Sequence, residues 1–169
     1  GGSISTNTSA NGAGLATDSI STGAATLTNT SISSNTATTN GGGLLLTGGI
    51  LTLNGVTVDG NAAATGDGIH QTGGTFNGQN TINFNTGDSV NQTGGTFNST
   101  SGTMNLTGNF TRSGGTFAHN NGTVVFNGTA AQSLGGSAST TFNNLTVNKT
   151  GTLTVGVNKW IANVVGGGN

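Results

Sequence analysis

A short internal repeat constrains the fold of this chain more than any other feature. Residues 65–77 read TGDGIHQTGGTFN and residues 86–98 read TGDSVNQTGGTFN, identical at ten of thirteen positions at an offset of 21. A third copy, TGNFTRSGGTF, occupies residues 107–117. Each copy places short apolar alternations between glycine-containing turns, which is typical of strands. A unit of about 20 residues that repeats along a chain indicates a solenoid, in which each unit packs on its neighbours.

The first and last thirds of the chain have repeats of their own. Residues 27–35 (LTNTSISSN) and 53–61 (LNGVTVDGN) align at an offset of 26, and each precedes a cluster of glycines. Further strand-and-turn units lie at 122–136 and 140–155. The repeats predict one continuous β-solenoid over residues 1–169, with longer coils in 1–64, regular coils with a period of 20–21 in 65–136, and C-terminal coils in 137–169.

The glycine cluster, Leu-x-Leu and Ile/Val-x-x-Asn-x-Ala pattern of the first third resembles the polymorphic outer-membrane protein repeats and related extracellular right-handed β-helix repeats. The units of the last third are similar to those of large bacterial extracellular repeat proteins, with a looser likeness to filamentous-haemagglutinin-type passengers. This resemblance implies a parallel β-helix and a location outside the cell or on its surface. It implies no particular activity.

A parallel β-helix also explains the composition. Gly, Thr and Asn make up 90 of 169 residues, whereas Leu, Ile, Val and Phe make up only 35. Chains this poor in large apolar residues are often disordered, but those usually carry high charge or much Pro, and this chain has neither. Strand residues alternate between two faces, so a narrow core needs an apolar residue at every second position only. We therefore predict an all-β, single-stranded parallel β-helix of roughly seven coils of about 20–28 residues.

In-register stacking of the coils predicts rows of equivalent side chains about 4.8 Å apart. The three aligned copies give one row of phenylalanines and one mixed apolar row inside the solenoid. The first row is Phe76, Phe97 and Phe117, and the second is Ile69, Val90 and Phe110.

The charge balance excludes several classes of function. The chain has three basic residues (Arg112, Lys149, Lys159) and a formal net charge of -1. Binding to nucleic acid or to an anionic membrane surface needs a dense set of Lys and Arg. The absence of Cys excludes disulfides and thiolate metal sites. We expect no cofactor, no nucleic-acid partner, no membrane insertion and no enzymatic activity, and so assign no catalytic, cofactor-binding or metal-binding residue.

The aspartates give the only candidates for a charged site. Asp67 and Asp88 occupy the same position in successive repeats, so their carboxylates could lie about 4.8 Å apart, as in a retaining glycosidase or half of a calcium site. Alternatively, each aspartate caps its own Gly-Asp turn, with Asn109 in that place in the third copy. We favour the capping interpretation. Asp59 and Asp18 have no evident partner.

The histidines and serines add no catalytic pattern. His70 is expected on a strand with its imidazole in solvent, and His119 lies in a turn. Serines are too frequent for a Ser-His-Asp combination to be informative, and no GxSxG motif is present. Polysaccharide lyases share the β-helix fold, but their chemistry needs clustered acids and bases that this sequence lacks.

Two further surface features follow from the Asn and Thr content. A single row of threonines, Thr75, Thr96 and Thr116, is expected on the regular coils, whereas an ice-binding solenoid would show Thr-x-Thr on every coil. Asn-x-Ser/Thr sequons are candidate glycosylation sites for an extracellular protein. They lie at Asn7, Asn29, Asn91, Asn98, Asn105, Asn109, Asn121, Asn127, Asn144 and Asn148.

The two ends of the sequence suggest self-association. An open solenoid end exposes unpaired strand edges, and the end segments here have no Pro and almost no charge. We expect a segment of a longer solenoid, or subunits that stack head to tail into filaments. The leading hypothesis is an extracellular or cell-surface structural protein; alternatives are an adhesin or carbohydrate-binding passenger, an ice-binding protein and an enzyme acting on polysaccharide. Candidate end-interface residues are Trp160, Ile161, Val164 and Val165.

Overall fold

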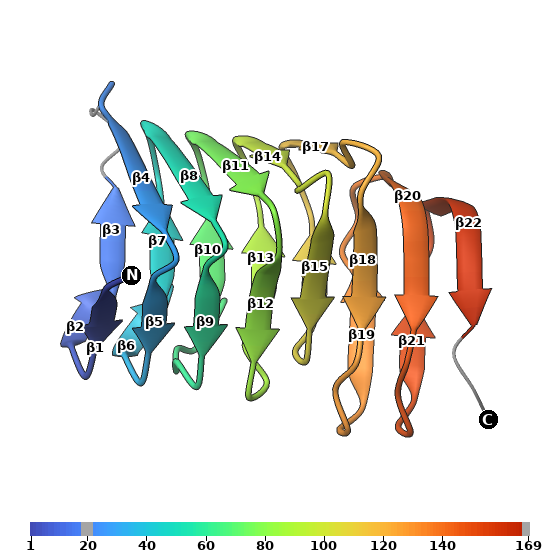
Figure 1. The fold of residues 1–169 in the computed structure, drawn as a ribbon, viewed down its shortest axis with the longest axis horizontal. Helices are drawn as coiled ribbons and strands as arrows, with labels where there is room; N and C mark the ends of the chain where they lie inside the picture. The colour runs from blue at the N-terminus through green and yellow to red at the C-terminus, as the bar shows by residue number, and fades with distance from the viewer. Residues whose placement is uncertain (18–21, 167–169) are drawn as a thin grey trace.

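The computed structural model describes residues 1–17 and 22–166, and it shows a parallel β-solenoid of about six turns with no helix in the described residues. The coils follow one another along the long axis of the molecule, with the two termini at opposite ends (Figure 1). The predicted all-β parallel β-solenoid is confirmed, with about six turns where the sequence suggested roughly seven coils. The described residues include no helix long and apolar enough to span a bilayer.

Each face of the solenoid is a parallel sheet, and four sheets are formed. Sheet 1 contains β1 (Ser3–Ser5), β5 (Ser31–Ser33), β9 (Thr57–Asp59), β12 (Ile82–Asn85), β15 (Thr103–Leu106), β18 (Thr123–Phe126), β20 (Thr140–Val147) and β22 (Lys159–Gly166). Sheet 2 contains β3 (Leu15–Thr17), β7 (Leu44–Leu46), β10 (Ile69–Gln71), β13 (Val90–Gln92), β16 (Phe110–Arg112), β19 (Gln132–Gly135) and β21 (Leu153–Val155). Sheet 3 contains β4 (Ala24–Thr28), β8 (Ile50–Asn54), β11 (Thr75–Gln79), β14 (Thr96–Asn98) and β17 (Thr116–Ala118). Sheet 4 contains only β2 (Thr8–Asn11) and β6 (Thr36–Asn40).

The coils become shorter from the N-terminal to the C-terminal end. Sheets 1 and 2 run through the whole body, but sheet 4 is confined to the first coils, where two isolated bridges extend it to Ala62 and Thr65. Sheet 3 ends at β17, and the eight-residue strands β20 and β22 follow it. Along the chain, the cross-section therefore loses first the side formed by sheet 4 and then the side formed by sheet 3. In sheet 1 the paired residues lie 28 positions apart at Ser3 and Ser31, 26 at Thr57 and Asn83, 20 at Thr103 and Thr123, and 19 at Thr140 and Lys159.

Alternate side chains of each strand point into the solenoid, and these inward side chains form the core. Phe76 pairs with Phe97, and Phe97 with Phe117, in the register that the repeat alignment predicts. The rings of Phe76 and Phe97 stack with centroids 4.2 Å apart, and those of Phe97 and Phe117 with centroids 5.8 Å apart. Phe117 is only partly buried, whereas the other two are fully buried. The second row also forms in register, with Ile69, Val90 and Phe110 all buried on sheet 2.

The corner between sheets 3 and 1 explains part of the Asn and Gly content. Asn29, Gly55 and Asn80 occupy this corner in three successive coils, with φ values of 49°, 61° and 56°. Glycine tolerates this left-handed region without steric cost, and asparagine is the residue with a side chain that adopts it most readily. Asparagine and glycine therefore recur at this corner at an interval of about one coil.

Candidate functional site

A row of buried carboxamides follows one corner of the first coils. Asn35 accepts hydrogen bonds at Oδ1 from the backbone N–H and the Nδ2 of Asn7 in the preceding coil, at 3.1 and 2.9 Å. Asn61 accepts the same two bonds from Asn35, also at 3.1 and 2.9 Å. The Nδ2 groups of Asn35 and Asn61 also donate to the backbone oxygens of Ile4 and Ile32. This row, the asparagine ladder, links successive coils through buried hydrogen bonds.

Asp88 ends the asparagine ladder. Its carboxylate is fully buried and accepts from the backbone N–H of Asn61 at Oδ1 and from the Asn61 Nδ2 at Oδ2, both at 3.0 Å. Burial raises the pKa of Asp88 to about 7, although the two Asn61 bonds act in the opposite direction. In the next coil the chain lies too close for a side chain, because a Cβ on Gly108 would be 2.4 Å from the Asp88 backbone oxygen.

Asp67 and Asp88 have different hydrogen-bond partners, and the negative charge of Asp67 contributes to raising the pKa of Asp88. Asp67 is half-buried, and its Oδ1 accepts from the backbone N–H of Ala63 within its own turn, at 2.9 Å. Capping of its own turn thus holds for Asp67, but Asp88 binds the preceding coil instead. Asn109 accepts at Oδ1 from the backbone N–H of Ser133 in the following coil. No three metal-ligating side chains of the described residues gather into a group that could hold a metal ion.

A second internal polar row lies on sheet 2, where Gln71, Gln92 and Arg112 stack in register after the apolar Leu46 of the preceding coil. Gln71 and Gln92 each donate from Nε2 to backbone oxygens of their own turn and of the next coil, Thr96 and Thr116. Gln71 Oε1 is buried and has no partner among the described residues. Arg112 closes the row by donating from Nε to Gln92 Oε1 at 3.1 Å.

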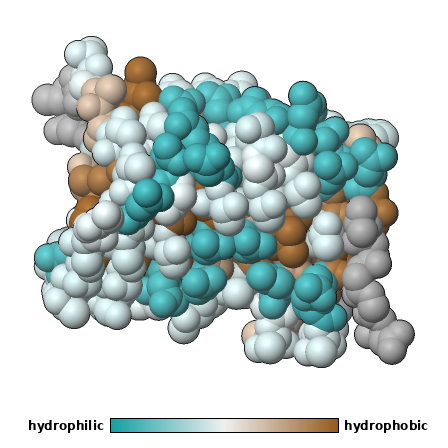
Figure 2. Space-filling view, in the orientation of Figure 1, coloured by the Kyte–Doolittle hydropathy of each residue, from teal (hydrophilic) through white to brown (hydrophobic). Residues whose placement is uncertain are grey.

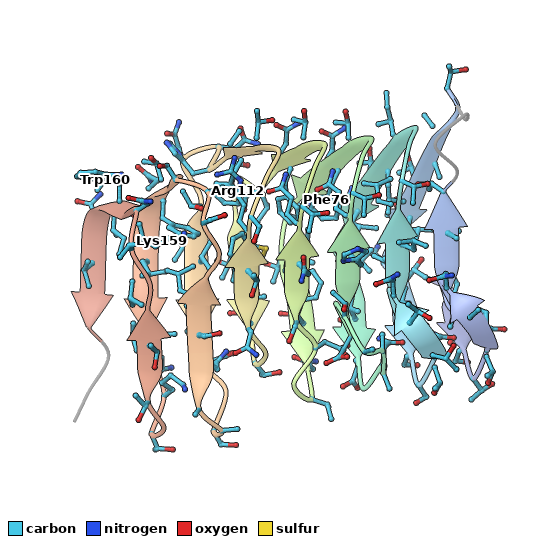
Figure 3. All side chains as sticks on the ribbon, turned by 180° about the vertical axis from the view of Figure 1, so that it is seen from behind. Phe76, Arg112, Lys159 and Trp160 are labelled. Atoms are coloured by element: carbon cyan, nitrogen blue, oxygen red, sulfur yellow. The ribbon has the colours of Figure 1, made fainter. Side chains whose placement is uncertain are left out.

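All three cations of the chain bind backbone oxygens. The Arg112 guanidinium also donates to the oxygens of Gly115 and Ser139. Lys159 donates to Gly136 and Ala138 at 3.0 and 2.9 Å, and Lys149 to Ala130 and Thr152, both at 2.8 Å. Figure 3 shows Arg112 and Lys159 close together near the C-terminal end. Desolvation lowers the pKa of Lys159, and the Arg112 charge lowers it further. These hydrogen bonds connect the three cationic side chains to turns of the solenoid.

His70 differs from its predicted placement. The sequence suggested an outward, solvated imidazole, but the residue is only 7% exposed and burial lowers its pKa. The cause is the segment 62–67, which continues sheet 4 past β6 and packs against the outer face of sheet 2, where Gly66 lies close to the His70 Cβ. The Nδ1 of His70 and the Oδ1 of its register neighbour Asn91 are buried, and neither has a hydrogen-bond partner in the described part of the chain.

A polar pocket of about 300 Å³ lies where this covering segment ends. Beyond segment 62–67, no strand of sheet 4 covers sheet 2 in the described residues, and a step is left between the segment and the next two coils. The wall of the step comes from segment 62–67 and its floor from β13, β16 and the turns before them. The polar side chains that line this step pocket are Thr65, Asp67, Ser89, Asn91, Asn109 and Thr111.

The outer face of sheet 3 carries the predicted row of threonines. Thr75, Thr96 and Thr116 pair in register, and the Thr116 hydroxyl donates to that of Thr96 at 3.1 Å. The adjacent row includes Asn77 and Asn98, which are joined by a 2.8 Å bond between their carboxamides. Hydrogen bonds therefore tie these outer rows together from coil to coil.

The C-terminal end holds the four residues predicted to form an end interface. Trp160 and Val164 are each 65% exposed, whereas Ile161 pairs with Phe142 and packs against the core. The side chain of Val165 lies outside the described part of the structure. Figure 2 shows apolar surface at this end beside a largely hydrophilic lateral face.

The sequon asparagines divide into two groups by their exposure to solvent. Asp18, named above among the aspartates, lies outside the described residues. Four sequon asparagines are half-buried on strands: Asn91, Asn98, Asn105 and Asn144. Six are exposed: Asn7, Asn29, Asn109, Asn121, Asn127 and Asn148.

No family model, no curated protein and no solved structure matches this chain. The asparagine ladder was not predicted, although a signal for it was present. Asn7, Asn35 and Asn61 each follow an inward Ile or Val by three positions, and these three apolar residues, Ile4, Ile32 and Val58, stack in register.

Proposed function

We propose that this chain is a structural β-solenoid of the cell exterior, a segment of a stalk, surface layer or fibre. The observation that carries the proposal is the continuity of sheets 1 and 2 along the whole body, with eight and seven parallel strands in register. The buried amides and all three cations bind the backbone or the neighbouring coil. The polar side chains thus serve mainly to hold coils together, which suits a rigid rod.

Extension of the rod would use the same two sheets. β22 and β21 expose an edge at one end, and β1 and β3 expose the opposite edges of the same two sheets at the other. Because every strand is parallel to its neighbour, a further coil or a second copy in the same orientation continues the ladder. The exposed Trp160 and Val164 give this contact an apolar component. Sheets 3 and 4 do not reach the C-terminal end, so sheets 1 and 2 alone form the joint.

The extracellular location is supported by the sequence rather than by a match to a known protein. The glycine cluster, Leu-x-Leu and Ile/Val-x-x-Asn-x-Ala pattern resembles the polymorphic outer-membrane protein repeats. Six exposed sequon asparagines are also available to a glycosylating cell. In this proposal the partner is a second copy of the chain or further repeats of the same kind.

Self-association can be tested by changing one residue of the terminal edge. Val164→Lys places a charge on the last strand of sheet 1, where natural edge strands use Lys to prevent pairing. Val125→Lys, on the outer lateral face of the same sheet, is the matched control. We expect sedimentation velocity and negative-stain electron microscopy to show concentration-dependent rods for the parent and for Val125→Lys, and monomers for Val164→Lys. Well-separated parent monomers at high concentration would contradict head-to-tail stacking.

A further inference from the structure

The step pocket is lined by a residue, Asn91, whose buried Oδ1 has no hydrogen-bond partner among the described residues. Elsewhere outer asparagines bind one another, as Asn98 binds Asn77 and Asn105 binds Asn83, both at 2.8 Å. Asn91 has His70 and Thr111 as its register neighbours, and no hydrogen bond joins its carboxamide to either of them. Its carboxamide therefore has no hydrogen-bond partner among the described residues.

Three other groups around the step pocket are also unpaired within the described part of the chain. The hydroxyls of Thr65 and Thr111 make no hydrogen bond, and Asp67 uses only Oδ1, in its bond with Ala63. The pocket thus combines two hydroxyls, one carboxamide and one carboxylate oxygen. These groups come from three successive coils, so the covering segment and the bare coils beyond it both contribute.

The lining determines the class of ligand. None of the lining residues is Lys or Arg, and Asp67 contributes a negative charge, so phosphate, sulfate and acidic sugars are disfavoured. The lining side chains are mostly hydrogen-bonding groups, which disfavours an apolar ligand. A single metal ion would leave most of the 300 Å³ unfilled. Neutral hydroxyl groups, which both donate and accept, match this mixture of partners.

We infer that the step pocket binds one unit of a neutral carbohydrate, with Asn91 and Asp67 as the hydrogen-bonding residues that fix its orientation. The volume is at the lower end of the roughly 300–1,000 Å³ of small-molecule sites, which suits one sugar ring and not a long oligosaccharide. Rotation of the Asn91 carboxamide about its terminal torsion, which has a broad energy profile, would direct its unpaired oxygen to a sugar hydroxyl. The site is lateral, so it remains accessible whatever joins the two ends.

Nuclear magnetic resonance titration of the ¹⁵N-labelled protein would test this inference. The probes are glucose, galactose, mannose and N-acetylglucosamine, each added to millimolar concentration, with calcium chloride as a separate titration. We expect at least one sugar to shift the amide signals of Gly66 and Thr111 and the side-chain NH₂ signal of Asn91. No shift at these residues with any sugar, or shifts there with calcium alone, would overturn the inference.

Matched variants separate binding from folding. We expect Asn91→Ala to weaken sugar binding by about ten-fold or more, as loss of a buried hydrogen-bond partner does. Asp67→Asn keeps an oxygen for the Ala63 N–H and should weaken binding only a few-fold. Asn98→Ala, an outer asparagine on sheet 3, should leave binding unchanged. If Asn91→Ala binds as the parent does while its unfolding midpoint is unchanged, or if Asn98→Ala loses binding equally, the assignment to the step pocket is wrong.

Discussion

The N-terminal and C-terminal halves of the solenoid fill their cores in different ways. In the long coils, paired residues of sheet 1 lie 26–28 positions apart. Several aliphatic side chains from sheets 1, 2 and 3 fill these coils, such as Leu44, Leu51 and Val58. The shorter coils have fewer inward positions, and all seven phenylalanines of the chain lie in residues 76–142. A shorter circuit with fewer apolar positions thus reaches close packing with larger side chains.

The buried polar rows differ in the same way. The long coils use neutral carboxamides at the corner after sheet 1, whereas the shorter coils use glutamine and finally Arg112 on sheet 2, at the position held by Leu46 in a long coil. Each region ends its row with an ionisable residue, Asp88 or Arg112. Burial shifts the pKa of both residues toward the neutral form, upward for Asp88 and downward for Arg112.

Removal of an aromatic ring should have the largest effect. Phe97→Ala should lower the free energy of unfolding by about 3–5 kcal/mol, because a fully buried ring stacked on two others is replaced by a cavity. Leu51→Ala, in the same row of a long coil, should cost about 2–3 kcal/mol. Urea unfolding followed by far-ultraviolet circular dichroism measures both. If Leu51→Ala lowers the free energy of unfolding as much as Phe97→Ala or more, the proposed difference between the two cores is wrong.

Asp88→Asn should stabilise the protein at neutral and alkaline pH. Because the folded-state pKa is raised to about 7 from the ordinary 3.8, folding takes up a proton, and the stability of the parent falls as pH rises between about 4 and 7. Asparagine removes the charge. Its single carboxamide oxygen extends the ladder by rotating to accept both Asn61 bonds, as Asn61 Oδ1 accepts both bonds of Asn35, in place of the two carboxylate oxygens that accept them in the parent. We expect a gain of roughly 2–4 kcal/mol at pH 8 and little change at pH 4. Urea unfolding across this pH range is the measurement; parallel pH profiles for parent and variant would be inconsistent with a buried, titrating Asp88.

Arg112 allows the second polar row to be tested. Arg112→Leu copies the residue of the long coil, but it leaves Gln92 Oε1 and two backbone oxygens without donors, and should cost about 2 kcal/mol. Arg112→Gln continues the glutamine row and should cost about 1 kcal/mol. Thermal unfolding of the two variants side by side provides the comparison. If leucine is tolerated as well as glutamine, the hydrogen bonds of Arg112 contribute little to stability.

The outer rows should matter least. Thr96→Val removes the hydroxyl that accepts from Thr116 but keeps the β-branched shape, so stability should change by no more than about 0.5 kcal/mol. Thr52→Val, on the same face of a long coil, should behave alike. Differential scanning calorimetry would detect a departure. A loss well above about 1 kcal/mol in one region alone would mean that surface rows, and not only the cores, distinguish the two halves.

The sequence was sufficient for the fold class and for the register of the phenylalanine row, because the repeat at residues 65–117 has nearly constant spacing. It was insufficient for Asp67 and Asp88, which are equivalent in that repeat but have different surroundings. Asp67 belongs to segment 62–67, the extra side of its coil, whereas Asp88 binds Asn61 of the preceding coil.

The partner of Asp88 lies in the longer repeat, and the spacing changes where the two repeats meet. Asn61 follows Val58 by three positions, but Asp88 follows Phe84, the register partner of Val58, by four. Because of this one additional residue, an alignment of the repeats does not show that Asp88 follows Asn61 in the asparagine ladder. The burial of His70 was missed for a related reason, since the segment that covers it belongs to a different side of the coil.

Every strand pairing among the described residues joins neighbouring coils, and the paired residues lie no more than about 30 positions apart in the sequence. The solenoid is therefore a one-dimensional array in which each coil contributes its own stability and one interface with each neighbour. Such an array unfolds from its ends, so the protection of amides from hydrogen exchange should increase from β22 towards the central coils. Under tension along its axis the molecule would lengthen coil by coil, absorbing work in small steps and not in one cooperative rupture.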